Sequence, residues 1–318
     1  MSRWIWLKLA VSIGLILLLV HHVDSSRLFQ WIAIADYKLA ALAVVVLSLQ
    51  LWVAALRWGQ VAQIFTATLS QLTLWRYCLV AQCFSQLLPS SVGADAIRIW
   101  LLYREGMAVR SAVLCTLCDR LWGVGALLLM VVTVMATPAV EKIAENQRLI
   151  LVLLVSAGLA ALIGVLVLGF LPRAWFERTR VLRIARELSD SMRVACELRR
   201  LVRIGPASVL IHGCSIVAIW LLAKAISLDV DVVVLGGMTV IALFAATLPI
   251  SIAGWGVREG VLVALLRSSG IAPEGALALS LLFGVALVIA SLPGAFVWFF
   301  KRADEGIAGK VEHVYESW

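Results

Sequence analysis

Residues 232–259 read VVVLGGMTVIALFAATLPISIAGWGVRE, and this stretch decides the fold. It is apolar up to Leu248, continues with Pro249 into a run of small residues, and ends on the adjacent charges Arg258 and Glu259. Proline lacks an amide donor and disfavours helix at the residue before it, so a helix is predicted to stop near Leu248. Such a break at membrane depth is tolerated only where it is buried in protein or lines a wet cavity.

A second stretch repeats this pattern earlier in the chain. Residues 87–98 read LLPSSVGADAIR and follow another apolar segment, 72–88. A single offset of 160 residues relates Pro89 to Pro249, Ser91 to Ser251, and Arg98 to Arg258. Gly93 and Gly254 would let the backbone turn after each proline. The agreement predicts an internal repeat built around two broken helices.

The composition sets the class of protein. Of the 318 residues, 63% are hydrophobic and 14% are charged, against about 45–50% and about 25% in soluble domains. A soluble enzyme is therefore excluded, and an outer-membrane barrel is excluded because its strands would alternate. Long apolar runs at 4–20, 39–56, 112–136, 149–171, 204–223 and 276–300 predict about six spanning helices. The fold class is all-α, a polytopic membrane helix bundle.

Arginine placement predicts the orientation. Residues 172–203 carry nine arginines and four acids, which favours the cytoplasmic side of an inner (plasma) membrane. Both termini then lie in the cytoplasm, provided that each broken segment enters and leaves on one side. We therefore expect re-entrant half-helix hairpins at 72–103 and 232–267, entering from opposite faces. If both halves of each broken segment crossed the membrane fully, the two termini would still lie on the same side. The second half of each segment is, however, short for a span.

These expectations divide the chain into parts of one membrane domain, residues 1–318. Residues 1–137 would form the first repeat and residues 204–300 the second, related as inverted repeats are in transporters. Between them, 172–203 has apolar residues every three or four positions with arginines between. It is predicted to be an amphipathic helix on the anionic cytoplasmic leaflet. An ordinary basic linker would explain the charge equally well.

Six ionisable residues gather around the breaks. Each would cost about 2.5–3.5 kcal/mol at the bilayer centre, so they must pair, reach water or bind a polar ligand. One reading is that Asp119 and Arg120 pair with Asp95 and Arg98 and only lock the bundle. The other is a substrate site, in which two arginines and two helix starts suit a phosphate. The candidate substrate-binding residues are Arg98, Arg258, Asp95, Glu259, Arg120, Asp119, Ser91, Ser251, Gly93, Gly254 and Trp255, with Pro89 and Pro249 as structural breaks.

Three quoted motifs carry a family resemblance: residues 87–98, residues 118–123 (CDRLWG) and residues 248–260 (LPISIAGWGVREG). Together they resemble the flippase-like family related to the lysylphosphatidylglycerol synthase transmembrane region. The resemblance implies a lipid-translocating bundle with Arg98, Asp119, Arg120, Arg258 and Glu259 on the polar positions of the family. Ala94 and Ala253 depart from the glycines expected there. The soluble aminoacyl-transfer domain is missing from this sequence, so lysine transfer is not implied.

The leading functional hypothesis is a transporter, not an enzyme, that moves an anionic lipid between leaflets. That lipid would be a phospholipid or a polyprenyl-phosphate carrier. Two alternatives stay open: a non-transporting scaffold for a soluble enzyme partner, and a membrane-embedded lipid headgroup transferase. No histidine has a metal-ligand spacing and no GxxxxGK phosphate loop occurs. We expect no metal, no cofactor and no nucleic acid partner.

Overall fold

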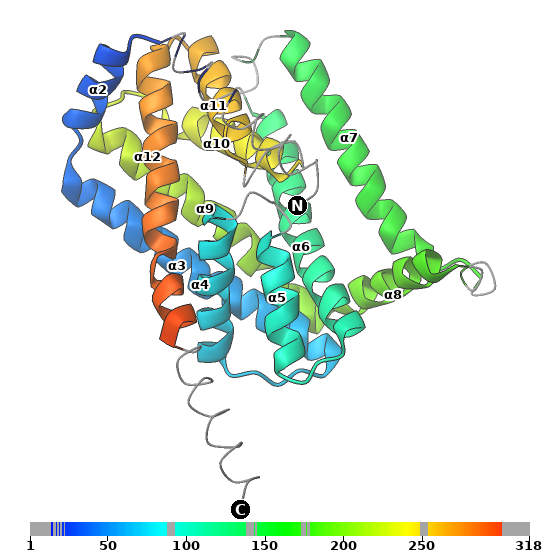
Figure 1. Cartoon of the computed structure of the whole chain (residues 1–318). Helices are drawn as coiled ribbons and strands as arrows, with labels where there is room; N and C mark the ends of the chain where they lie inside the picture. The colour runs from blue at the N-terminus through cyan, green and yellow to red at the C-terminus, as the bar shows by residue number, and fades with distance from the viewer. Residues whose placement is uncertain are drawn as a thin grey trace, which may run out of the picture.

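The computed structural model describes residues 23–87, 93–137, 145–172, 179–248 and 254–300, with residues 14, 17, 19, 21, 143 and 176 besides. Helices make up the secondary structure of these residues, and their arrangement is shown in Figure 1. The all-α fold class predicted from the sequence is confirmed. In chain order the elements are α2 (Ser25–Ala33), α3 (Tyr37–Ala62), the short 3₁₀ turn η1 (Gln63–Phe65), α4 (Gln71–Leu87), α5 (Gly93–Arg104), α6 (Val109–Met135), α7 (Glu145–Leu168), α8 (Arg180–Ala195), α9 (Leu198–Ala225), α10 (Val232–Thr247), α11 (Val257–Ser268) and α12 (Pro273–Ser291).

Five of the described helical segments are long and apolar enough to cross a membrane. They are Tyr37–Phe65, Val109–Met135, Gln147–Leu168, Leu198–Ala225 and Pro273–Phe300, and they correspond to five of the six predicted spans. The sixth, predicted over 4–20, lies largely outside the described residues. The chain is therefore a multi-pass membrane protein. Large apolar side chains on the outside, such as Leu153 on α7 and Phe296 after α12, fit a surface that faces lipid.

Aspartates start several of these helices. The Asp36 carboxylate accepts hydrogen bonds from the first-turn amides of α3, the closer from Lys38 N at 2.8 Å. Asp231 does the same for α10, with Val233 N at 2.9 Å. These carboxylates satisfy amides that have no partner inside the helix. The ends of the two helices are thus set by single residues.

Two long helices cross the centre of the molecule together. α3 packs along α9, and both run diagonally through the bundle in Figure 1. The buried face of α3 repeats every four residues through Ala43, Leu47, Leu51 and Ala55, as a helix packed on one side requires. Ser215 of α9 donates to Gln50 of α3 at 2.9 Å. A polar interhelical bond of this kind contributes about 0.6 kcal/mol in a membrane.

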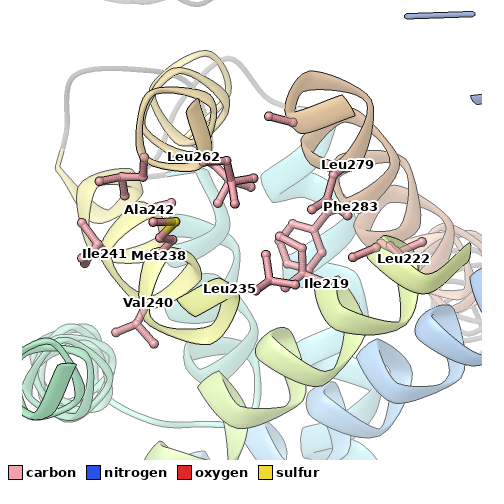
Figure 2. Close-up of a cluster of buried hydrophobic side chains, with 14 of the residues drawn as sticks. Ile219, Leu222, Leu235, Met238, Val240, Ile241, Ala242, Leu262, Leu279 and Phe283 are labelled. Atoms are coloured by element: carbon pink, nitrogen blue, oxygen red, sulfur yellow. The ribbon is translucent and has the colours of Figure 1, made fainter. Parts of the chain in front are cut away.

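The largest apolar core lies where α9, α10, α11 and α12 meet. Figure 2 shows Ile219 and Leu222 of α9 beside Phe283 of α12, and Met238 of α10 near Leu262 of α11. These side chains are at most 1% exposed. Because this core is continuous, α11 is held firmly against α10 and α12.

Each half of the two broken segments is a short helix, and their arrangement as re-entrant hairpins stays a prediction. α4 and α10 have 17 and 16 residues, and α5 and α11 have 12 each, all below the roughly 20 needed to cross a bilayer. The first break, residues 88–92, lies outside the described residues, with Pro89 and Ser91. Pro249, Ser251 and Ala253 also lie outside them. Gly93 is the first residue of α5 and is buried.

The basic segment differs from its prediction. The structure has a strongly amphipathic helix at α8, but it ends at Ala195, and α9 begins at Leu198. Leu198 and Val202 continue the apolar period by position, yet they belong to the next helix. The polar corner at Cys196 and Glu197 interrupts the pattern. Helix α2 was not among the predicted elements, because nine residues are too short for a span.

Gly294 provides a test of the packing. A Cβ at this position would collide with the backbone carbonyl of Leu79 on α4, and backbone cannot move aside as a flexible side chain can. Gly294→Ala should lower the free energy of unfolding by about 1–3 kcal/mol, measured by denaturant titration in detergent. Gly164→Ala on α7 meets nothing within 4 Å and should raise stability by up to about 1 kcal/mol, because alanine favours a helix more than glycine does. Equal stability of both variants would contradict the close approach of α4.

Candidate functional site

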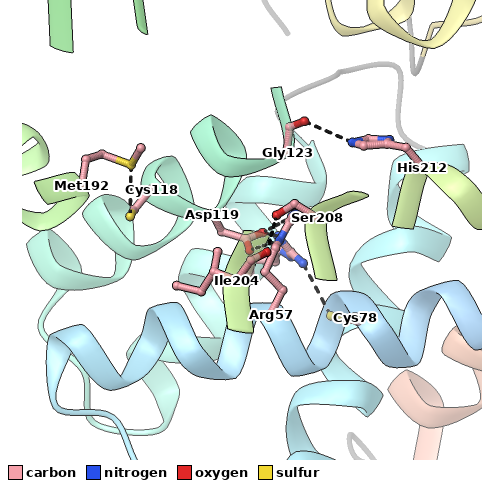
Figure 3. Close-up of polar contacts among 10 residues, drawn as sticks. Arg57, Cys78, Cys118, Asp119, Gly123, Met192, Ile204, Ser208 and His212 are labelled. Carbon is pink, nitrogen blue, oxygen red and sulfur yellow. Dashed lines mark hydrogen bonds and ion pairs between the residues drawn. The ribbon is translucent and has the colours of Figure 1, made fainter. Parts of the chain in front are cut away.

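A buried carboxylate shared by two arginines lies at the centre of the site. Asp119 of α6 accepts hydrogen bonds from Nε and Nη2 of Arg57 on α3, at 2.8 and 3.0 Å. Its Oδ2 also accepts from Nη1 of Arg98 on α5, at 2.8 Å. Figure 3 shows Arg57, Asp119 and their neighbours. Three helices are thereby joined through one side chain that is 1% exposed.

The surroundings of Arg57 hold its guanidinium in place. Nη1 lies 3.4 Å from Ser208 Oγ, and that hydroxyl donates to the Ile204 carbonyl at 2.8 Å. A Cβ at Gly123 would lie 3.3 Å from the same nitrogen, so a glycine here leaves room for the planar group. His212 of α9 lies with Nε2 3.1 Å from the Gly123 carbonyl (Figure 3). α3, α6 and α9 therefore converge on this guanidinium.

Arg98 is held more loosely. Beyond its bond to Asp119, Nη2 lies 3.5 Å from Cys78 Sγ and the guanidinium stacks on the Trp58 ring at 4.5 Å. Its side chain is 14% exposed, against 8% for Arg57. Sulfur is a weak acceptor, so most of the donor capacity of Arg98 is directed to one carboxylate oxygen.

The cluster of Arg57, Asp119 and Arg98 carries a surplus charge. Two guanidinium groups are always protonated, and one carboxylate neutralises only one of them. In surroundings of low dielectric the remaining positive charge is poorly screened. The cluster therefore attracts an anion.

A second ion pair lies beside this cluster. Arg120 of α6 pairs with Asp95 in the first turn of α5. The adjacent residues Asp119 and Arg120 of α6 thus bind Arg98 and Asp95 of α5, respectively. These two ion pairs join α5 to α6. This pair is balanced in charge, and the Arg120 side chain is 43% exposed.

The charges of the second broken segment pair with each other. Arg258 and Glu259 form a salt bridge in the first turn of α11, and both are buried. Glu259 Oε2 also accepts from Gly256 N at 2.6 Å, capping the helix start. Gly254 and Gly256 have φ of +79° and +84°, values that glycine adopts without strain. The Arg258 guanidinium lies 5.2 Å from the rings of Trp255 and Phe283.

Among the described residues, a hydrogen bond joins the two broken segments. Trp255 Nε1, in the turn before α11, donates to Gln86 Oε1 near the end of α4, at 3.3 Å. Arg98 and Arg258 bind different carboxylates, Asp119 and Glu259, respectively. A phosphate shared by these two arginines stays a prediction.

Sequence reasoning missed Arg57. The predicted apolar run ended at Leu56, which placed Arg57 at the end of a span, and Arg57 had no counterpart in the repeat. In the structure α3 continues to Ala62, so the arginine lies inside the helix with a buried tryptophan beside it. The apolar residues Trp58, Val61 and Ala62 after it are the signal that could have shown the helix continuing. Among the residues that the structure describes, no three His, Cys, Asp or Glu side chains could hold a metal ion.

These observations define a polytopic helical membrane protein with a net positive cluster inside its bundle. The model of the lysylphosphatidylglycerol synthase TM region matches residues 5–294. The chain therefore belongs to this lipid-related family, as its motifs predicted. A search among curated proteins found no match.

Replacing Asp119 tests the central interaction. Asp119→Asn keeps the shape but leaves two buried guanidinium groups without a counter-charge, so stability should fall by about 3–5 kcal/mol. The matched control is Glu187→Gln, which removes an ion pair to Arg110 whose side chains are 41% and 52% exposed. It should cost at most about 1 kcal/mol. Denaturant unfolding in detergent measures both, and an Asp119→Asn variant as stable as the control would refute the role of the cluster.

Proposed function

We propose that the protein moves an anionic lipid between the leaflets of the inner membrane. The observation that carries the proposal is the surplus positive charge of Arg57, Asp119 and Arg98 inside an apolar bundle. An uncompensated charge is costly at membrane depth and commonly marks a substrate pathway. Membership of a lipid-related family gives independent support.

Arg98 is the residue assigned to the lipid phosphate. Arg57 is tied to Asp119 by two bonds and to Ser208 by a third, whereas Arg98 gives Asp119 one. Arg98 can therefore turn toward a phosphate while Arg57 keeps Asp119 neutralised. A guanidinium group binds phosphate with two parallel hydrogen bonds. Arg98 would gain this pair of bonds when it turns from Asp119 to the phosphate.

The second broken segment would complete the site. In this proposal the phosphate lies between Arg98 and Arg258, near the starts of α5 and α11, where the helix dipoles favour an anion. The bond from Trp255 to Gln86 supports the proximity of the two segments. The segments would act as re-entrant hairpins of an inverted repeat, and rocking of one repeat against the other would expose the site alternately.

No chemical step is part of this proposal, and the protein is not assigned an enzymatic activity. The acyl chains of the lipid stay in apolar surroundings at membrane depth while its headgroup crosses along the charged residues. Both termini would lie in the cytoplasm, on the side of α8, because that helix and the start of α9 carry the excess of arginine.

The transport proposal is tested by Arg98→Gln. Removing this arginine leaves Arg57 and Asp119 as a balanced pair, so the fold should persist while the exchange of fluorescent phosphatidylglycerol between leaflets of proteoliposomes is lost. The control is Arg110→Gln, at the exposed ion pair with Glu187, which should exchange lipid like the original protein. Exchange that survives in Arg98→Gln would remove this residue from the site. Absence of exchange in the original protein would overturn the function itself.

We also propose that α8 rests on the anionic headgroups of the cytoplasmic leaflet. Arg183 in the first turn of α8 and Arg199 and Arg203 at the start of α9 are exposed. Cys196, at the corner between the two helices, is an exposed thiol. In nanodiscs, Cys196 should react more slowly with a bulky maleimide when phosphatidylglycerol replaces phosphatidylcholine. Changing the three arginines to glutamine should abolish the difference. A rate that ignores lipid charge in the original protein would contradict this contact.

A further inference from the structure

A second feature of the site region is an apolar cavity of about 280 Å³ between α6, α7, α8 and α9. Its walls include Leu129 of α6, Leu162 of α7 and Leu201 of α9. Apolar cavities of about 150 Å³ stay dry and bind molecules such as benzene. This one has room for a segment of an alkyl chain.

α6 and α7 pack closely beside the cavity. A Cβ at Gly158 of α7 would lie 2.9 Å from Leu128 of α6, and one at Gly125 of α6 would lie 3.3 Å from Leu162. The two helices are therefore in close contact at these glycines. Away from this contact α7 stands at the edge of the bundle and α8 lies across its end (Figure 1). The cavity occupies the space between this contact and α8.

Two buried polar groups lie directly behind its apolar walls. Ser208 lines the cavity, and its Oγ lies 3.4 Å from Nη1 of Arg57. Trp122 lines it too, and its buried Nε1 has no acceptor among the described residues. A buried N–H without an acceptor is unfavourable, so a ligand that supplies one gains a hydrogen bond. An apolar space with a donor beside a positive cluster matches a molecule that has a chain, an acceptor oxygen and an anionic group, in that order.

We infer that this cavity holds one acyl chain of an anionic phospholipid. The inference rests on the proposed function, because the phosphate of the same lipid would bind the cluster of Arg57, Asp119 and Arg98. The chain lies along the α6 and α9 walls, and its ester carbonyl accepts the hydrogen bond from Trp122. The surplus charge of the cluster selects an anionic lipid over a neutral one.

Filling the cavity tests the inference. Gly205 of α9 lines it, and a Cβ there would meet only Leu201 Cδ1 at 3.8 Å. Gly205→Phe should therefore occupy the space of the chain without moving backbone. Gly213→Phe is the matched control, since Gly213 lies on the same helix, outside the cavity, with nothing within 4 Å of its Cβ.

The measurement uses purified full-length protein in detergent with substoichiometric phosphatidylglycerol that carries a photoreactive diazirine in its acyl chain. Adducts mapped by mass spectrometry should concentrate on the cavity walls of α6 and α9. They should be lost from these walls in Gly205→Phe and retained in Gly213→Phe. Adducts spread evenly over exposed faces such as 149–154 of α7, or unchanged in Gly205→Phe, would overturn the inference.

Trp122→Phe tests the hydrogen bond separately, because it keeps the ring and removes the N–H. Labelling by the diester lipid should exceed labelling by the matched diether lipid in the original protein, and the two should be equal in Trp122→Phe. Equal labelling in the original protein would refute the contact to the carbonyl.

Exchange between leaflets, measured in parallel, separates this inference from the proposed function. Lipid exchange without labelling of the cavity walls refutes only the binding of an acyl chain in the cavity. Labelling that is lost in Gly205→Phe, without lipid exchange, supports acyl-chain binding and refutes transport.

Discussion

The Asp119 carboxylate, bound by guanidinium groups from two other helices, is the interaction on which the rest of the structure depends. Removing ions from water costs several kcal/mol each, even after the protein relaxes. That cost is offset only if each ion finds partners of good geometry, and Arg57 meets this condition through Nε and Nη2 of the same fork. α3, α5 and α6 must therefore keep their mutual positions. The charges specify this arrangement more than they stabilise it.

The lipid surroundings explain why the polar groups lie inside the helix bundle. Lipid tails are as apolar as leucine, so burying leucine side chains adds little to helix association in a bilayer, and close packing with a few polar bonds must hold the helices together. The glycine contact of α7 with α6 and the bond from Ser215 to Gln50 are of this kind. The cluster of Arg57, Asp119 and Arg98 differs from these contacts because it has two positive charges and one negative charge. Equal numbers of each sign would suffice to hold the helices together.

The sequence predicts the helices well because two strong signals agree: long apolar runs, and Leu-Pro pairs that end α4 and α10 near the expected residues. It predicts less about contacts. The crosswise pairing of Asp95 with Arg120 and Arg98 with Asp119 was one of two open readings, and periodicity could not choose between them. Arg57 could not be placed in the cluster, because its partner is 62 residues away and only the packing of α3 on α6 brings them together. The corner at Cys196 was hidden because the apolar period continues through it.

The ion pairs inside the bundle differ in their charge balance. Arg120 with Asp95, and Arg258 with Glu259, are balanced, so each can persist without a ligand. The cluster around Asp119 is not balanced, and its excess lies on Arg98, the arginine with fewer bonds and greater exposure. An anionic headgroup that binds there would neutralise the cluster and lower the cost of its burial. The same headgroup would lose its own hydration on binding, and this cost offsets the gain from neutralising the cluster. Such a balance is the condition for a lipid to enter the site and leave it again.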